Sequence, residues 1–292
     1  GLEIEALQKE HETTLKNIVR YEDILNNYDS MANVIIEEME AYKKEFGRKR
    51  RTAIENAEEA VFEEKKIEEQ EVVFLMDRFG YAKTVDTSVY ERNREAADSE
   101  NKYIVHCMNT GKICIFTDTG KMHQVKVLDL PYGKFRDKGI PIDNLSNYNS
   151  SEENFIYIIN LGAIIHSRLL FGTRTAMLKM VDGSEFDVAK RTTAATKLNE
   201  DDELLIVHAM TGEETVVMQS EKEMFLRIEA STIPEKKKGA VGVRGMKLNA
   251  GDALSHIYVL DGESEQTVEV KGKEVVLNRL RVGNRDTKGT KR

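Results

Sequence analysis

Alternating apolar and polar residues mark a pair of short strands near the middle of the chain. Between Lys112 and Leu128, two alternating runs flank the turn Asp118-Thr119-Gly120, in which glycine supplies the positive φ angle that a tight hairpin requires. Pro131 follows the second run, and proline cannot donate a hydrogen bond to a sheet ladder. A lone hairpin is only marginally stable in water, so this pattern predicts further hairpins that bury its faces.

Four more segments have the same pattern, each with a turn at its centre. They are residues 72–85, 168–181, 216–228 and 266–277. The turns recur at intervals of roughly 50 residues, which is typical of propellers and solenoids that contain one small sheet per repeat. Apolar runs suited to inner or linking strands lie between the hairpins, at residues 103–107, 155–159, 204–208 and 254–258. We therefore predict a mainly β, propeller-like domain of about five blades over residues 71–292.

The beginning of the chain has a helical period instead. Apolar residues recur at the a and d positions of heptads from Ile4 to Leu25, with two polar interruptions. This seam leaves open an ordinary amphipathic helix or one strand of a coiled coil. A break follows, in which we expect Asp29 or Ser30 to cap a second helix over residues 31–46.

Charge is unevenly distributed along the chain. Residues 1–70 carry 11 basic and 18 acidic side chains, whereas the remainder is nearly neutral and residues 271–292 carry eight basic and two acidic ones. The acidic stretch 55–70 contains no glycine, and we interpret it as a partly helical linker. The predicted organisation is a helical segment over residues 1–54, this linker, and the β domain over residues 71–292.

The sequence contains no recognisable catalytic or metal-binding motif. The six histidines lie far apart, and His106, His208 and His256 recur at similar places in the repeats, which indicates strand register rather than a metal site. A phosphate loop, a nucleophile elbow and a metal signature are all missing. We expect no catalytic residue, metal or cofactor in this chain.

Basic residues instead gather in the polar loops that follow the hairpins. The candidate DNA-binding residues are Arg92, Arg94, Lys134, Arg136, Lys138, Lys190, Arg191, Lys236, Lys237, Lys238, Arg244, Arg285 and Lys288. Repeats place equivalent loops along one rim, so these charges would form a curved track for phosphates, with affinity independent of base sequence. Neighbouring glycines would let the backbone approach a phosphate closely. The alternative is that these residues are ordinary solvated loop charges.

An ordered set of motifs resembles the C-terminal part of bacterial type II DNA topoisomerase A subunits, those of DNA gyrase and topoisomerase IV. The motifs of the β domain are Asp77–Lys83, Ile115–Lys121, Val125–Pro131, Phe135–Leu145 and Gly239–Leu248. Tyr21–Leu25 and Glu45–Ile54 are similar to the end of the A-subunit coiled coil and its exit. Each motif is weak alone, but together they cover nearly the whole chain in the family's order.

The resemblance implies a β-pinwheel that binds and bends duplex DNA without sequence preference during ATP-dependent changes of DNA topology. The partners that it implies are a second A subunit, in a homodimer, and an ATPase B subunit. ATP and magnesium would bind to other domains of the parent enzyme or to the B subunit. The parent enzyme would be an isomerase. Arg20-Tyr21 matches the dipeptide of the DNA-cleaving site, but it lies on the heptad seam, so we interpret Tyr21 as a packing residue. This chain alone is therefore expected to have no turnover.

One motif departs from the gyrase pattern. Gyrase carries a box of glutamine, arginines, glycines and a basic residue after its opening hairpin, and this box is tied to DNA wrapping. Residues 91–98 retain two arginines there but no glycine, and three acidic residues are present. This departure, with a blade count below the six usual in gyrase, favours a topoisomerase IV A subunit or a divergent gyrase-like paralogue.

Two other classes of function are compatible with a repeat β domain. The alternative to a DNA module is a propeller-type protein-interaction scaffold with a coiled-coil dimerisation arm, although the chain lacks the Trp-Asp repeats that many such scaffolds carry. An enzyme that uses the propeller channel would need clustered carboxylates or histidines on inner strands. Cys107 and Cys114 fit a reducing compartment as buried thiols, and no apolar run reaches about 18 residues, so we expect a cytoplasmic protein without a membrane span.

Overall fold

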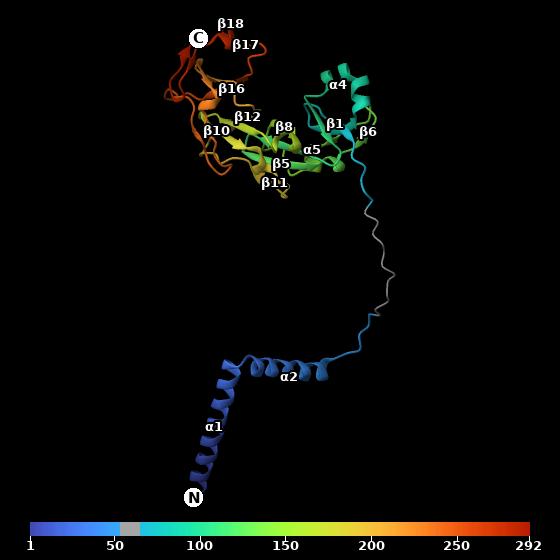
Figure 1. The fold of residues 1–292 in the computed structure, drawn as a ribbon, viewed down its shortest axis with the longest axis vertical. Coiled ribbons are helices and arrows are strands. Elements are labelled where there is room, and N and C mark those ends of the chain that lie inside the picture. Colours follow the sequence, from blue (N-terminus) through green and yellow to red (C-terminus); the bar gives the residue numbers. More distant parts are fainter. Residues whose placement is uncertain (53–64) are drawn as a thin grey trace. The chain divides into compact units, whose positions relative to one another are not determined.

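The computed structural model describes residues 1–52 and 65–292. They belong to two compact units, Gly1–Lys65 and Lys66–Arg292 (Figure 1). The predicted linker over residues 55–70 lies mostly outside the described residues. No helix in the described ranges is long and apolar enough to cross a membrane.

The first unit contains two helices, α1 (Leu2–Asn26) and α2 (Tyr28–Phe46). The expected cap of the second helix is wrong, because the N-cap is Asn27, whose side chain accepts a hydrogen bond from the N–H of Asp29 at 3.1 Å. Ser30 lies one turn further on, and its hydroxyl donates to Asp23 Oδ2 at 2.7 Å, which ties the start of α2 to the end of α1. Neither helix has a buried residue, so the heptad seam is exposed in this structure.

The second unit contains four complete blades, each a sheet of four or five strands built around one hairpin. Blade 1 contains β3 (Tyr103–Met108), β1 (Glu71–Met76), β2 (Tyr81–Asp86), β6 (Tyr132–Gly133) and β7 (Ile140–Pro141). Blade 2 contains β8 (Phe155–Asn160), β4 (Lys112–Thr117), β5 (Lys121–Lys126) and β11 (Thr192–Ala194).

Blades 3 and 4 repeat this arrangement. Blade 3 contains β12 (Leu204–Met210), β9 (Arg168–Thr173), β10 (Met177–Asp182) and β15 (Val243–Arg244). Blade 4 contains β16 (Leu254–Leu260), β13 (Thr215–Ser220), β14 (Met224–Glu229), β19 (Val282–Gly283) and β20 (Thr290–Lys291). A fifth hairpin, β17 (Thr267–Val270) and β18 (Lys273–Val276), forms a two-stranded sheet of its own.

Adjacent repeats exchange strands. The strand on one side of each hairpin comes from the same repeat, and these inner strands, β3, β8, β12 and β16, contact one another in that order. The strand on the other side comes from the stretch that follows the next hairpin along the chain. We call these stretches closing segments 1 to 4, numbered by the blade that they complete: residues 131–141, 190–194, 235–244 and 282–291.

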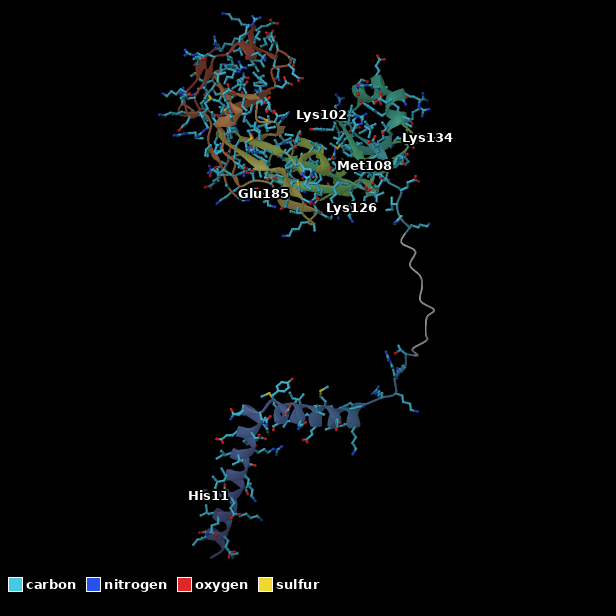
Figure 2. The ribbon with its side chains drawn as sticks, viewed as in Figure 1. His11, Lys102, Met108, Lys126, Lys134 and Glu185 are labelled. Carbon is cyan, nitrogen blue, oxygen red and sulfur yellow. The ribbon has the colours of Figure 1, made fainter. Side chains whose placement is uncertain are left out.

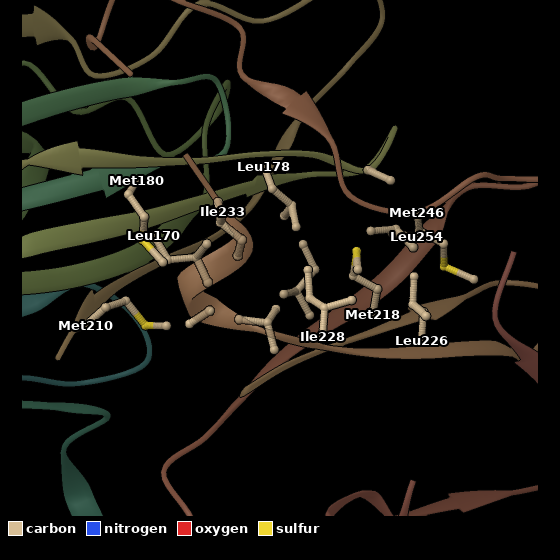
Figure 3. Close-up of a cluster of buried hydrophobic side chains, with 14 residues drawn as sticks. Leu170, Leu178, Met180, Met210, Met218, Leu226, Ile228, Ile233, Met246 and Leu254 are labelled. Carbon is tan, nitrogen blue, oxygen red and sulfur yellow. The ribbon is translucent and has the colours of Figure 1, made fainter. Parts of the chain in front are cut away.

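The main core clusters lie between successive blades. Hairpin strands are apolar on both faces because alternate side chains point to the blade before and the blade after: Ile113 and Ile115 pack with Phe74 of blade 1, whereas Cys114 and Phe116 pack with Phe171 of blade 3. Figure 3 shows the cluster between blades 3 and 4, in which Leu170 and Leu178 meet Met218 and Leu226.

Helices cover the outer face of blade 1. α3 (Thr87–Arg92) and α4 (Arg94–Glu100) follow β2 and bury Tyr90 and Ala97 against Val73 and Leu75. In the later repeats, the stretch between the hairpin and the inner strand forms a closing segment, whereas in the first repeat it forms α3 and α4. Two four-residue helices, α5 (Ile142–Leu145) and α6 (Leu161–Ile164), lie in the connections of blades 1 to 3.

The predicted fold class is confirmed: a β-pinwheel with four complete blades and a fifth hairpin, preceded by helices. All five hairpins and all four inner strands lie where the apolar alternation predicts them, within about two residues. His106, His208 and His256 lie on inner strands, in agreement with the register interpretation. The closing segments differ from expectation, because the sequence pattern reads them as polar loops and they are partly strands.

Candidate nucleic-acid interface

A long polar side chain from each blade holds its closing segment in place. This side chain lies on the second strand of each hairpin and donates hydrogen bonds to backbone carbonyls. Lys83 and Lys179 bind carbonyls within closing segments 1 and 3. Arg227 binds carbonyls just before closing segment 4, and Gln124 binds carbonyls just before and at the start of closing segment 2. Sequence reasoning missed these residues. Their signal is a cation or amide within an otherwise apolar strand, as in Ala-Met-Leu-Lys-Met-Val over residues 176–181.

Lys179 shows the arrangement most clearly. Its side chain is 1% exposed, and Nζ donates to the carbonyl oxygens of Lys237 at 3.1 Å, Lys238 at 3.1 Å and Ala240 at 2.6 Å. Burial lowers the pKa of Lys179 to about 8. Because these carbonyls face inward to the ammonium, the loop is fixed while the side chains of Lys236 and Lys237 are exposed.

Glycines in three closing segments are required by close backbone approach within the protein. A Cβ at Gly139 would lie 2.8 Å from the carbonyl oxygen of Ala82, and one at Gly242, where φ is +107°, would lie 2.6 Å from that of Leu178. Gly289 lies against Phe225 in the same way. We expected such glycines to allow contact with phosphate, but the fold itself requires these three, whereas Gly239 has open space around it.

Most of the candidate basic residues lie on the closing segments. These residues are Lys134, Arg136 and Lys138 of segment 1, Lys190 and Arg191 of segment 2, Lys236, Lys237, Lys238 and Arg244 of segment 3, and Arg285 and Lys288 of segment 4. All four segments lie at the sheet edge opposite the inner strand. Figure 1 labels β6 of segment 1 and β11 of segment 2, and Figure 2 labels Lys134. Their charges therefore recur at equivalent positions of successive blades.

Four candidates on the closing segments make side-chain contacts within the protein, and one of them is Arg191, which donates to the carbonyl oxygen of Leu145 at 2.9 Å. Arg244 forms an ion pair with Asp286, and Arg285 donates to the carbonyl oxygen of Arg244 at 3.0 Å. Lys238 is half-buried, and its Nζ donates to the backbone carbonyl of Glu185 at 3.1 Å. These contacts fix the segments, so part of the predicted interface also has a structural role.

The segment that corresponds to the gyrase box forms the end of α3 and most of α4. Arg94 lies 3.6 Å from Glu91 and 4.0 Å from Asp98, and the hydroxyl of the buried Tyr90 donates to Asp98 at 2.7 Å. Arg92 is exposed on α3. This segment therefore covers the first blade and largely neutralises its own charge.

A buried polar network in blade 2 was also missed by sequence reasoning. His123, 1% exposed, lies 2.8 Å from Thr192 Oγ1 through Nδ1 and 3.0 Å from Glu153 Oε2 through Nε2. Burial raises the pKa of Glu153, but hydrogen bonds from the Asn149 N–H, His123 and the hydroxyls of Thr117 and Thr119 outweigh burial and lower it overall. The network ties closing segment 2 to the loop before β8.

The two cysteines are both buried and form no disulfide, as the sequence predicts. Burial raises the pKa of Cys107 to about 11 and that of Cys114 to about 12, so neither thiol is a ready nucleophile. Within the described residues, no group of three His, Cys, Asp or Glu side chains could hold a metal ion.

Two repeats of the pinwheel match the model of a known protein family. Residues 167–209 and 214–261 match the family model of the DNA gyrase C-terminal domain, a β-propeller. Each matched stretch begins at a hairpin, passes through a closing segment and ends with an inner strand, so the two stretches are the third and fourth repeats. These two repeats are thus similar to those of the DNA gyrase C-terminal domain.

Relatives extend this likeness over the whole chain. The A subunit of DNA gyrase from Staphylococcus epidermidis is 27% identical over 310 residues, covering 100% of this chain and 35% of that protein. The chain is thus similar to the C-terminal part of a type II topoisomerase A subunit, and spans about a third of the length of the curated relatives that it matches.

Solved structures share the fold of the gyrase-like pinwheel. The C-terminal domain of DNA topoisomerase IV superposes with a TM-score of 0.68 at 19% identity, covering 77% of this chain and 73% of that one. The DNA gyrase A C-terminal domain superposes with a TM-score of 0.52 at 16% identity, covering 76% of each chain. In sequence the relatives are gyrase A subunits, whereas in structure the pinwheel is nearer to the topoisomerase IV domain.

Proposed function

We propose that the pinwheel is the duplex-DNA-binding and DNA-bending module of a bacterial type II topoisomerase A subunit, of the topoisomerase IV or divergent gyrase type. In the intact enzyme, its partners are a second A subunit together with an ATPase B subunit. The observation that carries the proposal is the repeated placement of basic residues on the closing segments. Among the described residues, Arg244 is the only candidate on these segments that lies within ion-pair distance of a carboxylate.

Cations on equivalent sheet edges suit the phosphate backbone of DNA. Each blade adds a similar group of charges at a similar place, so a duplex that follows successive blades would meet them in turn and bend. Phosphate contacts of this kind position the duplex and carry no base information. Two-residue strands such as β6 and β19 are too short to read a groove as a recognition helix or ribbon does.

The salt dependence of duplex binding tests this proposal. If the closing segments neutralise about five phosphates, the logarithm of the binding constant should fall with the logarithm of salt concentration with a slope near −4 to −5. Replacing Lys236 and Lys237 with glutamate should remove about two contacts and reduce the slope by about 1.8, equally for unrelated duplexes. Lys238 is left in place because its side chain is bonded to Glu185.

A matched control makes the same charge changes elsewhere. Lys9 and Lys16 are exposed on α1, and their replacement by glutamate should leave the slope unchanged. If duplex DNA shows no salt-dependent binding to the unmodified chain or to either variant, the closing-segment charges are solvated loop charges. The alternative, a protein-interaction scaffold with a coiled-coil dimerisation arm, would then take the place of this proposal.

A further inference from the structure

Blade 2 contains a basic cavity that the closing-segment charges alone do not explain. A cavity of about 320 Å³ lies beside β5 and is lined by Lys112, Lys126, Lys190 and Arg191, with Asp129 as its one carboxylate. Figure 2 labels Lys126 in this blade. None of the four cations lies within ion-pair distance of a carboxylate of the described residues. The cavity therefore has a net charge of about +3 at neutral pH.

The pair of lysines at the end of this hairpin departs from the pattern of the other complete blades. Lys112 and Lys126 lie directly opposite each other across the hairpin, and like charges in this position repel. The residue at the place of Lys126 is acidic in blades 1, 3 and 4, where it is Asp86, Asp182 and Glu229. A local arrangement that weakens the hairpin without a compensating contact is characteristic of a functional site.

Lys126 also replaces a helix cap. Asp86 and Asp182 accept hydrogen bonds from the N–H groups of Ser88 and Ser184 at the start of the following turn, at 2.8 and 2.9 Å. Lys126 begins the equivalent turn and makes no side-chain cap. Blade 2 thus lacks a stabilising contact that blades 1 and 3 possess, and a second cation faces the cavity instead.

Gln124 fixes one wall of the same cavity. Gln124 is 6% exposed, and its Nε2 donates to the carbonyl oxygens of Val188 at 2.9 Å and Lys190 at 3.0 Å, which fixes the orientation of the amide. Oε1 is left buried with no hydrogen-bond donor in the described part of the protein. Less than 1 Å² of this oxygen is exposed, so a ligand in the cavity does not reach it, and the role of Gln124 is to hold the backbone of Val188 and Lys190 at the cavity wall.

We propose that this cavity binds the phosphate of a nucleotide. Lys112, Lys126 and Lys190 contact the phosphate oxygens, and the Gln124 amide fixes the position of Lys190 by donating to its backbone carbonyl. The guanidinium of Arg191, which donates to the Leu145 carbonyl at 2.9 Å, is held at the edge of the site. The phosphate can come from a free nucleotide or from DNA, and only the DNA source rests on the proposed function.

Replacing Lys126 with aspartate tests the site without threatening the fold. This substitution introduces the residue of blades 1 and 3 and restores their cap, so the midpoint of thermal unfolding should not fall. The full chain is titrated by calorimetry with adenosine monophosphate, with adenosine as the ligand without phosphate, and separately with duplex DNA. Lys197→Asp, at an exposed position outside the cavity, makes the same charge change and is the control.

Binding of adenosine monophosphate that weakens at least tenfold in Lys126→Asp and less than twofold in Lys197→Asp supports the proposal with a free nucleotide as the source. A loss of duplex affinity that exceeds that of Lys197→Asp supports it with DNA as the source. If neither ligand distinguishes the two variants, the proposal is overturned. The Lys236 and Lys237 variants report on DNA binding independently, so such a failure would leave the proposed function standing.

Discussion

Single buried polar residues hold together parts of the pinwheel that are distant in sequence. Lys179 on β10 binds three carbonyls of closing segment 3, about 60 residues further along the chain. Charged hydrogen bonds of this kind contribute about 1.5–3 kcal/mol each when they are well formed, although part of this is offset by the cost of burying the ammonium. The position of the Lys236–Lys238 loop therefore depends on one side chain in the neighbouring repeat.

Lys179→Met should release this loop. Methionine fills the apolar part of the site but donates no hydrogen bond, so we expect trypsin to cleave after Lys236, Lys237 or Lys238 at least several times faster than in the wild type. Cleavage at Lys134 and Lys138 of closing segment 1, which Lys83 holds, should not change and is the internal control. Equal rates in both proteins would show that contacts other than those of Lys179, such as the bonds with Met180 and Glu185, are enough to hold the loop.

Glu153 should make stability depend on acidity. Its pKa in the folded protein lies below the ordinary value of 4.5, so its contribution is present above pH 4.5 and is lost as the pH falls through the folded-state pKa. Glu153→Gln should lower the free energy of unfolding by about 1–3 kcal/mol at pH 7, because an amide cannot accept all of these hydrogen bonds.

The difference in stability should shrink below pH 4.5, where the wild-type carboxylate becomes protonated. Urea unfolding at pH 7, 5 and 3.5 measures it. Asp143→Asn, which changes a carboxylate in the same part of the blade outside the network, is the control. A difference that stays constant over this range would mean that the pKa of Glu153 is the same in the folded and the unfolded protein.

At the scale of elements, α3 and α4 limit the contribution that residues 91–98 can make to DNA binding. They pack Tyr90 and Ala97 onto blade 1, and Arg94 is placed between Glu91 and Asp98. Replacing Arg92 and Arg94 with alanine should therefore weaken duplex binding only modestly, by about twofold to threefold at 100 mM salt, since nearby carboxylates already oppose the phosphates.

An electrophoretic mobility assay compares this variant with the one that carries glutamate at Lys236 and Lys237. The closing-segment variant should lose much more affinity. A loss in the arginine variant as large as that caused by removing the whole pinwheel would identify α3 and α4 as the principal DNA-binding element.

At the scale of the whole molecule, the two units differ in charge. Gly1–Lys65 carries 10 basic and 16 acidic side chains, a net charge of −6, whereas Lys66–Arg292 carries 33 and 35, a net charge of −2, with basic groups on each closing segment. The acidic part should repel DNA when salt is low, so a truncated chain that begins at Lys66 should bind duplex slightly more tightly at 25 mM salt. The two chains should bind equally at 300 mM, where charges are screened beyond about 6 Å. Tighter binding by the full chain would indicate that the helices contribute contacts of their own.

The chain should not relax or cleave plasmid DNA. Tyr21 lies on α1 with 58% of its surface exposed, and the described residues place no metal-binding cluster near it or elsewhere. Agarose gels of supercoiled plasmid incubated with the chain and magnesium should show no nicked or linear product. Nicking that disappears in Tyr21→Phe would overturn this prediction.

Local pattern was sufficient to locate the hairpins, the inner strands and the helices. Period-two alternation with glycine turns identified β4 and β5, and heptad spacing identified α1, because both signals depend on neighbouring residues. The basic residues of the closing segments were also visible as charges. The sequence did not show that these residues lie on segments that complete the preceding blade.

Only the tertiary structure decided which strands share a sheet. Each blade is completed by a segment of the next repeat, held by Lys83, Gln124, Lys179 or Arg227 through contacts across about 50 residues or more. Such pairing depends on strand register and on carbonyl groups that every residue possesses, so residue identity carries little trace of it. The same reason hid the Lys126 cavity, since the residues that line it come from four separate stretches of the chain. A cation or an amide in the middle of an apolar strand was the one local sign of this arrangement.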